Sequence, residues 1–295
     1  MEAVFRSKLK GRPMREVIEE TCPIELPGGA GAQQTSAVRD YWDAHTLGFQ
    51  YVSDPRIVPG TRAFFDHIRP WMSPFKFPWL MERIEREAAL LSGRRLLEVG
   101  CGLGYVSLEF IRRGARVTAT DLTPQAVSLT RCHFEMENVQ AEDVRVENVL
   151  SLSFRDDSFD AVWANGVVHA TGDAALAIRE IRRILKPGGR AIISHFYRRG
   201  SWMHFLSRFG RENVEFKDED PPVNEWYTDR EILDMFDGFE IVEAVREHHR
   251  ALPVARYGMK ALLYRGLFRP AYNLLPEGLA KALAYKFSVT AVKKG

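Results

Sequence analysis

Three glycines at alternate positions, Gly100, Gly102 and Gly104, follow the short segment RRLLEV at residues 94–99. Glycine lacks a Cβ atom, so it accepts positive φ and lets backbone N–H groups come close to a ligand. The spacing is GxGxG and differs from the dinucleotide fingerprint GxGxxG, which requires a glycine where Tyr105 stands. The glycines therefore predict a polar ligand against the backbone, but they do not name it.

Asp121 lies twenty-one residues after Gly100, at the end of the segment ARVTATD. An acidic side chain at this place can accept two hydrogen bonds from the diol of a ribose. The alternative is that Asp121 only caps the following helix. Thr123 and Pro124 already supply an N-cap and a first helical residue, so the ribose role is favoured.

Strands and helices alternate around these residues. Short apolar runs predict strands, and apolar residues at helical spacing predict the helices between them. The expected strands are residues 94–99, 115–121, 144–149, 159–166 and 190–197, and the expected helices are 103–114, 124–137 and 172–189. In the last helix Asp173 is the expected cap, and Pro187, Gly188 and Gly189 are the expected end.

This alternation is typical of parallel βαβ units with right-handed crossovers. Two late alternating segments, 239–249 and 286–295, have no simple crossover between them, so we expect them to pair antiparallel at one edge. The predicted fold class is α/β, a doubly wound Rossmann-like sheet with an antiparallel edge strand.

The chain divides into three expected parts. Residues 1–36 are polar and rich in small residues, which predicts a flexible arm. Residues 37–90 are aromatic and interrupted by prolines, which predicts a helical cap that packs on the main domain or walls a substrate pocket. Residues 91–295 form the main domain, with an insertion at 250–285.

Composition excludes several classes of protein. A net charge of +2 lacks the positive field of a nucleic-acid binder. Three widely spaced cysteines favour neither a disulfide framework nor a metal cluster. The absence of a signal-like or membrane-spanning apolar run predicts a cytoplasmic protein.

Several motifs in succession resemble those of class I S-adenosylmethionine-dependent methyltransferases, especially the small-molecule branch. They are LLEVGCGLG, VTATDLTP, VLSLSFRDDSFDAVWANGVVHA and REIRRILKPGGRAIIS, within residues 90–200. The resemblance implies a seven-stranded sheet that binds S-adenosyl-L-methionine at its carboxyl edge. It implies no metal.

The resemblance also implies roles for individual residues. Glu98 and the loop from Gly100 through Cys101 and Gly102 to Gly104 would hold the methionyl part, and Asp121 would bind the ribose. Leu122 would lie beneath the adenine, which the Asn148 side chain and the Val149 N–H would address. Asn148 departs from the acid common in the family, although an amide oxygen can accept the same bond. Asn165 and Gly166 would lie beside the methyl group.

Methyl transfer from a sulfonium mainly requires an aligned nucleophile and the exclusion of water. A general base helps when the acceptor arrives protonated. The candidates are His169 after the fourth strand and His195 and Tyr197 at the end of the fifth. Each of them can instead only line the pocket.

The leading hypothesis is methyl transfer to a small molecule, a bulky apolar or aromatic metabolite. A second hypothesis is a catalytically silent cofactor-binding subunit, and a third, a nicotinamide dehydrogenase, is disfavoured by the glycine spacing. The insertion at 250–285 is open to three readings: a lid, a homodimer contact, or a membrane-surface segment. The last is disfavoured because Pro270 and Pro276 interrupt any long amphipathic helix.

Overall fold

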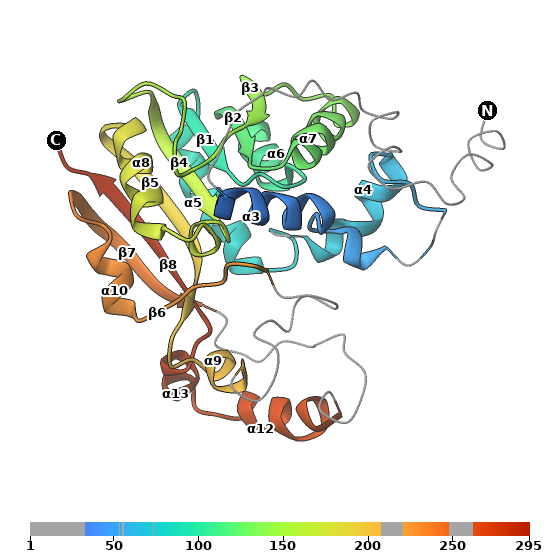
Figure 1. Cartoon of the computed structure of the whole chain (residues 1–295), viewed down its shortest axis with the longest axis vertical. Coiled ribbons are helices and arrows are strands. Elements are labelled where there is room, and N and C mark those ends of the chain that lie inside the picture. The colour runs from blue at the N-terminus through green and yellow to red at the C-terminus, as the bar shows by residue number, and fades with distance from the viewer. Residues whose placement is uncertain (1–32, 53, 55, 73, 208–220, 248–261) are drawn as a thin grey trace.

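The computed structural model describes residues 33–52, 54, 56–72, 74–207, 221–247 and 262–295 (Figure 1). The greater part of the predicted arm at 1–36 and the start of the predicted insertion at 250–285 lie outside these residues.

The centre of the described chain is an eight-stranded sheet. Its strands are β1 (Arg95–Val99), β2 (Arg116–Asp121), β3 (Asp143–Val146), β4 (Phe159–Asn165), β5 (Leu185–Arg198), β6 (Trp226–Tyr227), β7 (Phe239–Glu247) and β8 (Lys286–Lys293). The order is β3-β2-β1-β4-β5-β8-β7, with β6 paired to β5. The order reverses beside β1, so the doubly wound prediction is confirmed.

The antiparallel pair predicted at the edge is also confirmed. Strand β8 runs antiparallel to both of its neighbours, β5 and β7. The reversed strand itself therefore lies one place inside the sheet, and β7 forms the edge. A strand that enters between two others must satisfy hydrogen bonds on both sides, and β8 is buried over its first six residues.

Helices cover both faces of the sheet. The helices of the described residues are α3 (Gln33–Ala44), α4 (Arg62–Ile68), α5 (Pro78–Leu91), α6 (Tyr105–Arg112), α7 (Pro124–Met136), α8 (Ala174–Ile184), α9 (Trp202–Ser207), α10 (Asp229–Asp234), α12 (Arg269–Asn273) and α13 (Glu277–Ala282). Helices α5, α6 and α7 pack on one face, and α8 and α10 pack on the other. Alternate strand residues therefore belong to different cores: Leu97 faces α8, and Leu96 faces α5 and α6.

Local capping follows the sequence at two helices. The Thr123 side chain accepts a hydrogen bond from the Ala126 N–H, and the Asp173 side chain accepts one from the Leu176 N–H. The predicted end of the helix at 172–189 was wrong, because α8 ends at Ile184 and Leu185 is already extended. Pro187 disfavours helical backbone in the residue before it, so the chain joins β5 before the Pro-Gly-Gly segment.

The N-terminal segment lies against the helices beside the loop after β1. It consists of α3, α4 and two single 3₁₀ turns, Phe49–Tyr51 and Arg69–Trp71. Asp43 and Thr46, at and just after the end of α3, accept hydrogen bonds from Gln125 at the start of α7. Helix α5, which lies in the same predicted segment, packs in the core of the sheet.

A small lobe, in which α9, α12 and α13 lie together, extends beyond the carboxyl end of β5 (Figure 1). Its centre is aromatic and includes Trp202, Tyr272 and Tyr285. No helix among the described residues has the length and apolar character needed to cross a membrane.

Candidate active site

The three glycines of the loop between β1 and α6 all adopt left-handed φ, at +71° for Gly100, +56° for Gly102 and +77° for Gly104. They do so for different reasons. A Cβ on Gly100 would lie 2.2 Å from Val167 Cγ2, and one on Gly104 would lie 2.9 Å from both Thr130 Cγ2 and Phe134 Cε1. A Cβ on Gly102 would meet no atom within 4 Å. Gly100 and Gly104 are therefore required for packing, and Gly102 faces open space.

Asp121 fixes this loop from the end of β2. One carboxylate oxygen accepts the Gly102 N–H at 3.0 Å, and the other accepts the N–H and hydroxyl of Thr123 at 3.0 Å. Burial raises the pKa of Asp121 above its usual value, against the opposing effect of these donors. A carboxylate has about four acceptor sites, so lone pairs remain for a ligand.

A cavity of about 920 Å³, the loop cavity, opens in front of these groups. Eight of the predicted cofactor residues line it: Gly100, Gly102, Asp121, Leu122, Asn148, Val149, Asn165 and Gly166. The Asn148 side-chain oxygen accepts the Leu150 N–H at 3.0 Å, which leaves it one further acceptor site. The predicted positions are thus brought together around one space.

Three predicted cofactor residues, Glu98, Cys101 and Gly104, are not among the lining residues. The Cys101 thiol is buried and lies 3.5 Å from the Thr130 hydroxyl. Glu98 is 3% exposed and accepts a short hydrogen bond from the Ser107 hydroxyl. The structure therefore places these three residues beneath the lining of the loop cavity, and their contact with the cofactor stays a prediction.

Burial raises the pKa of Glu98 from 4.5 to about 8. Between these values the unfolded chain releases the proton and the folded protein keeps it, so this group lowers stability as pH rises. We expect Glu98→Gln to remove that dependence. The variant should match the parent near pH 4.5 and gain about 1.4 kcal/mol over it per pH unit up to pH 8. Urea unfolding of both proteins at several pH values tests this, and parallel stability curves would contradict it.

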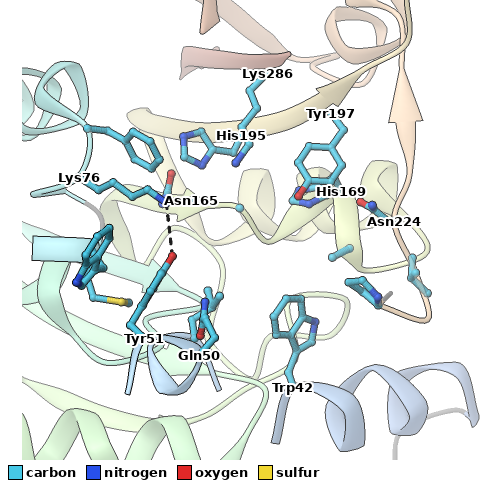
Figure 2. A pocket seen from close by; sticks show the side chains of 18 residues that line it. Trp42, Gln50, Tyr51, Lys76, Asn165, His169, His195, Tyr197, Asn224 and Lys286 are labelled. Carbon is cyan, nitrogen blue, oxygen red and sulfur yellow. Dashed lines mark hydrogen bonds between the residues drawn. The ribbon is translucent and has the colours of Figure 1, made fainter. Parts of the chain in front are cut away.

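A second cavity, of about 840 Å³, is the aromatic cavity, and Figure 2 shows the side chains that line it. Its walls come from distant parts of the chain: residues 42–77, the ends of β4 and β5, residues 221–224, and Lys286 of β8. The predicted base candidates His169, His195 and Tyr197 all line it. None of the described residues of the insertion, 262–285, does so.

The two cavities share five lining residues: Trp42, Leu47, Asn165, Gly166 and Ala170. They therefore meet at the end of β4, with Trp42 of α3 opposite. A ligand in one cavity would contact a ligand in the other at this junction.

Three residues that line the aromatic cavity carry a buried polar atom without a hydrogen-bond partner in the described part of the chain, namely Asn165 at Oδ1, His169 at Nδ1 and Asn224 at Nδ2. A buried polar atom without a partner costs about 1–3 kcal/mol. Burial and the charge of Lys286 lower the pKa of His169 to about 3, so its imidazole is neutral at physiological pH. These atoms indicate a polar ligand.

His195 lies between the junction and a buried carboxylate. Its Nδ1 is 4.0 Å from the place of a Cβ on Gly166, and its Nε2 is 3.8 Å from Glu247 Oε2. Glu247 is also paired with Arg83 at 2.6 Å. The backbone of His195 has φ +72°, which is uncommon outside glycine and is often found at functional sites.

Residues 97–193 match a family model described as a methyltransferase domain. This segment of the chain is therefore a methyltransferase domain by its match to the family model, and it holds the motifs that resemble those of class I S-adenosylmethionine-dependent methyltransferases. It is similar to the ubiquinone biosynthesis O-methyltransferase of Xanthomonas oryzae pv. oryzae, with 37% identity over 124 residues, 42% of this chain and 49% of the relative. The X. euvesicatoria protein of that name is 36% identical over the same length. The chain spans about half the length of the curated relatives it matches.

Solved structures share the fold of this methyltransferase domain. Phosphoethanolamine N-methyltransferase 2 of Haemonchus contortus has a TM-score of 0.59 at 18% identity, with 92% of this chain and 62% of that chain covered. The [4+2]-cyclase SpnF has a TM-score of 0.57 at 19% identity, with 92% and 99% covered. A methyltransferase-like protein of Bacillus halodurans has a TM-score of 0.53 at 19% identity, with 73% and 99% covered.

The residues that line the loop cavity fit S-adenosyl-L-methionine, the cofactor of this family. Asp121 offers acceptor sites to a diol, and the open side of Gly102 lets a ligand approach the backbone. Leu122 and Val149 offer apolar surfaces for a base. No cluster of His, Cys, Asp or Glu within the described ranges could hold a metal ion.

Sequence reasoning missed Glu247 and the lysines of the aromatic cavity. Nothing in the sequence pairs Glu247 with His195, because the contact depends on how β7, β8 and β5 lie side by side. The aromatic segment did signal a pocket wall, and Trp42, Tyr51 and Trp71 do line the cavity.

Proposed function

We propose that this protein transfers a methyl group from S-adenosyl-L-methionine to a hydroxyl of a bulky apolar or aromatic small molecule by direct displacement. The observation that carries the proposal is the junction at Asn165 and Gly166, which line both the loop cavity and the aromatic cavity. A cofactor in the first cavity and an acceptor in the second would meet there.

The residues of the loop cavity would hold the cofactor. Asp121 would accept hydrogen bonds from the ribose hydroxyls, and the backbone of the glycine loop would contact the methionyl part. Leu122 and Val149 would enclose the adenine, and the Asn148 oxygen would accept from its amino group. When bound, the cofactor supplies an electrophilic methyl group on a positively charged sulfur.

His195 is the base that the geometry favours. Its Nδ1 faces the junction, and the buried carboxylate of Glu247 stabilises the imidazolium that forms when Nδ1 takes the hydroxyl proton. His169, neutral and without a partner at Nδ1, would accept or donate a hydrogen bond that orients the acceptor. Tyr197 packs on His169 with ring centroids 4.2 Å apart and holds it in place.

Oxygen is the favoured receiving atom for two reasons. A neutral histidine base suits an acceptor that arrives protonated and uncharged, as a phenol does. The curated relatives are named O-methyltransferases.

The first test is calorimetric titration with S-adenosyl-L-methionine, followed by an assay for acceptor-dependent release of S-adenosylhomocysteine from a panel of phenols and apolar alcohols. Binding with release supports the proposal. Binding without release from any acceptor supports the silent cofactor-binding subunit instead. A cytoplasmic location and the absence of a nucleic-acid partner stay predictions from the sequence.

The base assignment makes a separate prediction. We expect His195→Ala to lower kcat by about 100-fold or more, with a small change in the Kd of the cofactor, because a general base contributes 10²–10⁴-fold. Glu247→Gln should lower kcat less, because Glu247 acts only through the imidazole of His195. A larger loss of kcat in His169→Ala than in His195→Ala would contradict the assignment.

A further inference from the structure

We propose that the acceptor carries a carboxylate, which the Lys76 ammonium and the Tyr51 hydroxyl bind at the wall of the aromatic cavity. The inference rests on the proposed function, because it specifies the class of small molecule that enters this cavity.

The charged residues that line the aromatic cavity are of one sign. Among the lining residues in the described ranges, two are lysines, Lys76 and Lys286, and none is Asp or Glu. A cavity with positive walls attracts an anion and repels a protonated amine. The lining therefore selects against cationic acceptors.

Lys76 is held at the cavity wall without a carboxylate partner in the described part of the chain. Its Nζ lies 3.4 Å from the Tyr51 hydroxyl, 5.7 Å from the centre of the Tyr51 ring and 5.4 Å from that of Phe77. In Figure 2 the Lys76 side chain extends toward the pocket and meets the Tyr51 hydroxyl. Aromatic contacts hold an ammonium in place but leave its hydrogen-bond donors available.

Tyr51 is fixed so that its hydroxyl stays beside Lys76. Its ring stacks on Trp71, with centroids 5.5 Å apart and planes 16° apart. The hydroxyl can donate to one carboxylate oxygen while the ammonium donates to the other. A single ammonium with one hydroxyl suits a monoanion, so a carboxylate is favoured over a phosphate.

The other lining residues indicate the chemical character of the rest of the acceptor. Trp42, Trp71 and Phe77 line it, and the Trp71 side chain is 52% exposed, so a bound ring would cover apolar surface that water now contacts. On the opposite wall Asn224 Nδ2 has no hydrogen-bond partner among the described residues and would donate to a polar substituent. We infer an aromatic acid that bears the hydroxyl to be methylated.

Matched pairs of probes test the charge alone. We would titrate the protein, saturated with S-adenosylhomocysteine, with a panel of hydroxybenzoates and hydroxynaphthoates and with their amides. Each acid and its amide have nearly the same shape and differ in charge. We expect the acid to bind about 10- to 100-fold more tightly than its amide, the usual effect of a hydrogen bond to a charged group.

Variants then test whether Lys76 supplies the positive charge that binds the carboxylate. Lys76→Gln should remove the preference for the acid and leave the affinity for the amide unchanged, whereas Lys76→Arg should keep the preference. Lys281→Gln is the matched control, because Lys281 is an exposed lysine of α13 paired with Glu277 outside the cavity. Thermal unfolding of each variant shows that the fold is retained.

The outcomes separate this inference from the proposed function. Equal affinity for acids and amides, no binding of any acid in the panel, or an acid preference that survives in Lys76→Gln would each overturn the inference. If the parent protein does not bind S-adenosyl-L-methionine, the proposed function itself is overturned. Tight binding of the acids without methyl release would support the carboxylate site and argue against the transfer chemistry.

Discussion

Asp121→Ala is expected to weaken binding of S-adenosyl-L-methionine by at least about 100-fold. The variant lacks the carboxylate that accepts hydrogen bonds from the ribose diol, and a hydrogen bond to a charged group is worth about 1.5–3 kcal/mol. The Gly102 N–H, which donates to Asp121 at 3.0 Å, would also lose its acceptor. Calorimetric titration of the parent and the variant measures the change in Kd.

Two further variants show whether the loss belongs to this carboxylate. Asp121→Asn should give an intermediate Kd, because the amide keeps one acceptor oxygen and places its NH₂ against an N–H donor. Asp143→Asn alters a carboxylate on the neighbouring β3 that is 44% exposed, and it should leave the Kd unchanged. Cofactor binding within threefold of the parent in Asp121→Ala would contradict the assigned site.

Gly100→Ala and Gly102→Ala should have different principal effects, although the two residues lie in the same loop. The first should mainly lower stability, and the second should mainly weaken cofactor binding. Each substitution costs about 1–2 kcal/mol for a side chain at positive φ. In Gly100→Ala the new methyl also collides with Val167, which adds about 1–3 kcal/mol of overpacking. Gly102→Ala places its methyl in the open loop cavity and should mainly weaken cofactor binding.

Urea unfolding and cofactor titration of both variants distinguish these effects. We expect the larger loss of unfolding free energy in Gly100→Ala. In Gly102→Ala we expect a smaller loss of stability, together with a clear increase in the Kd of S-adenosyl-L-methionine. Equal losses of stability in the two variants would show that the contact with Val167 does not determine the role of Gly100.

The sequence by itself determined seven of the eight strands of the sheet, all but the two-residue β6, and the residues that meet at the loop cavity. Strand and helix periodicity, the glycines after β1 and Asp121 at the end of β2 are local signals, each within a single βα unit. Parallel strands bring their carboxyl ends to one edge, so residues that end neighbouring strands meet without further information. This is why Gly102, Asp121 and Asn165 line one space, as their positions predicted.

The same local reasoning could not tell which residues face the cavity. Glu98, Cys101 and Gly104 belong to the same motif as Gly102, but they face the core beneath the loop. Side-chain direction alternates along a strand and changes at each left-handed glycine. Only the folded loop therefore separates supporting residues from residues at the cavity.

The tertiary structure alone decided the aromatic cavity and its charge. Its walls join Tyr51 and Lys76, before the first strand, to Asn224 and Lys286, near the end of the chain. The pairing of His195 with Glu247 likewise depends on the place of β8 between β5 and β7. Such contacts between distant segments arise from packing of the whole chain, which no local pattern in the sequence specifies.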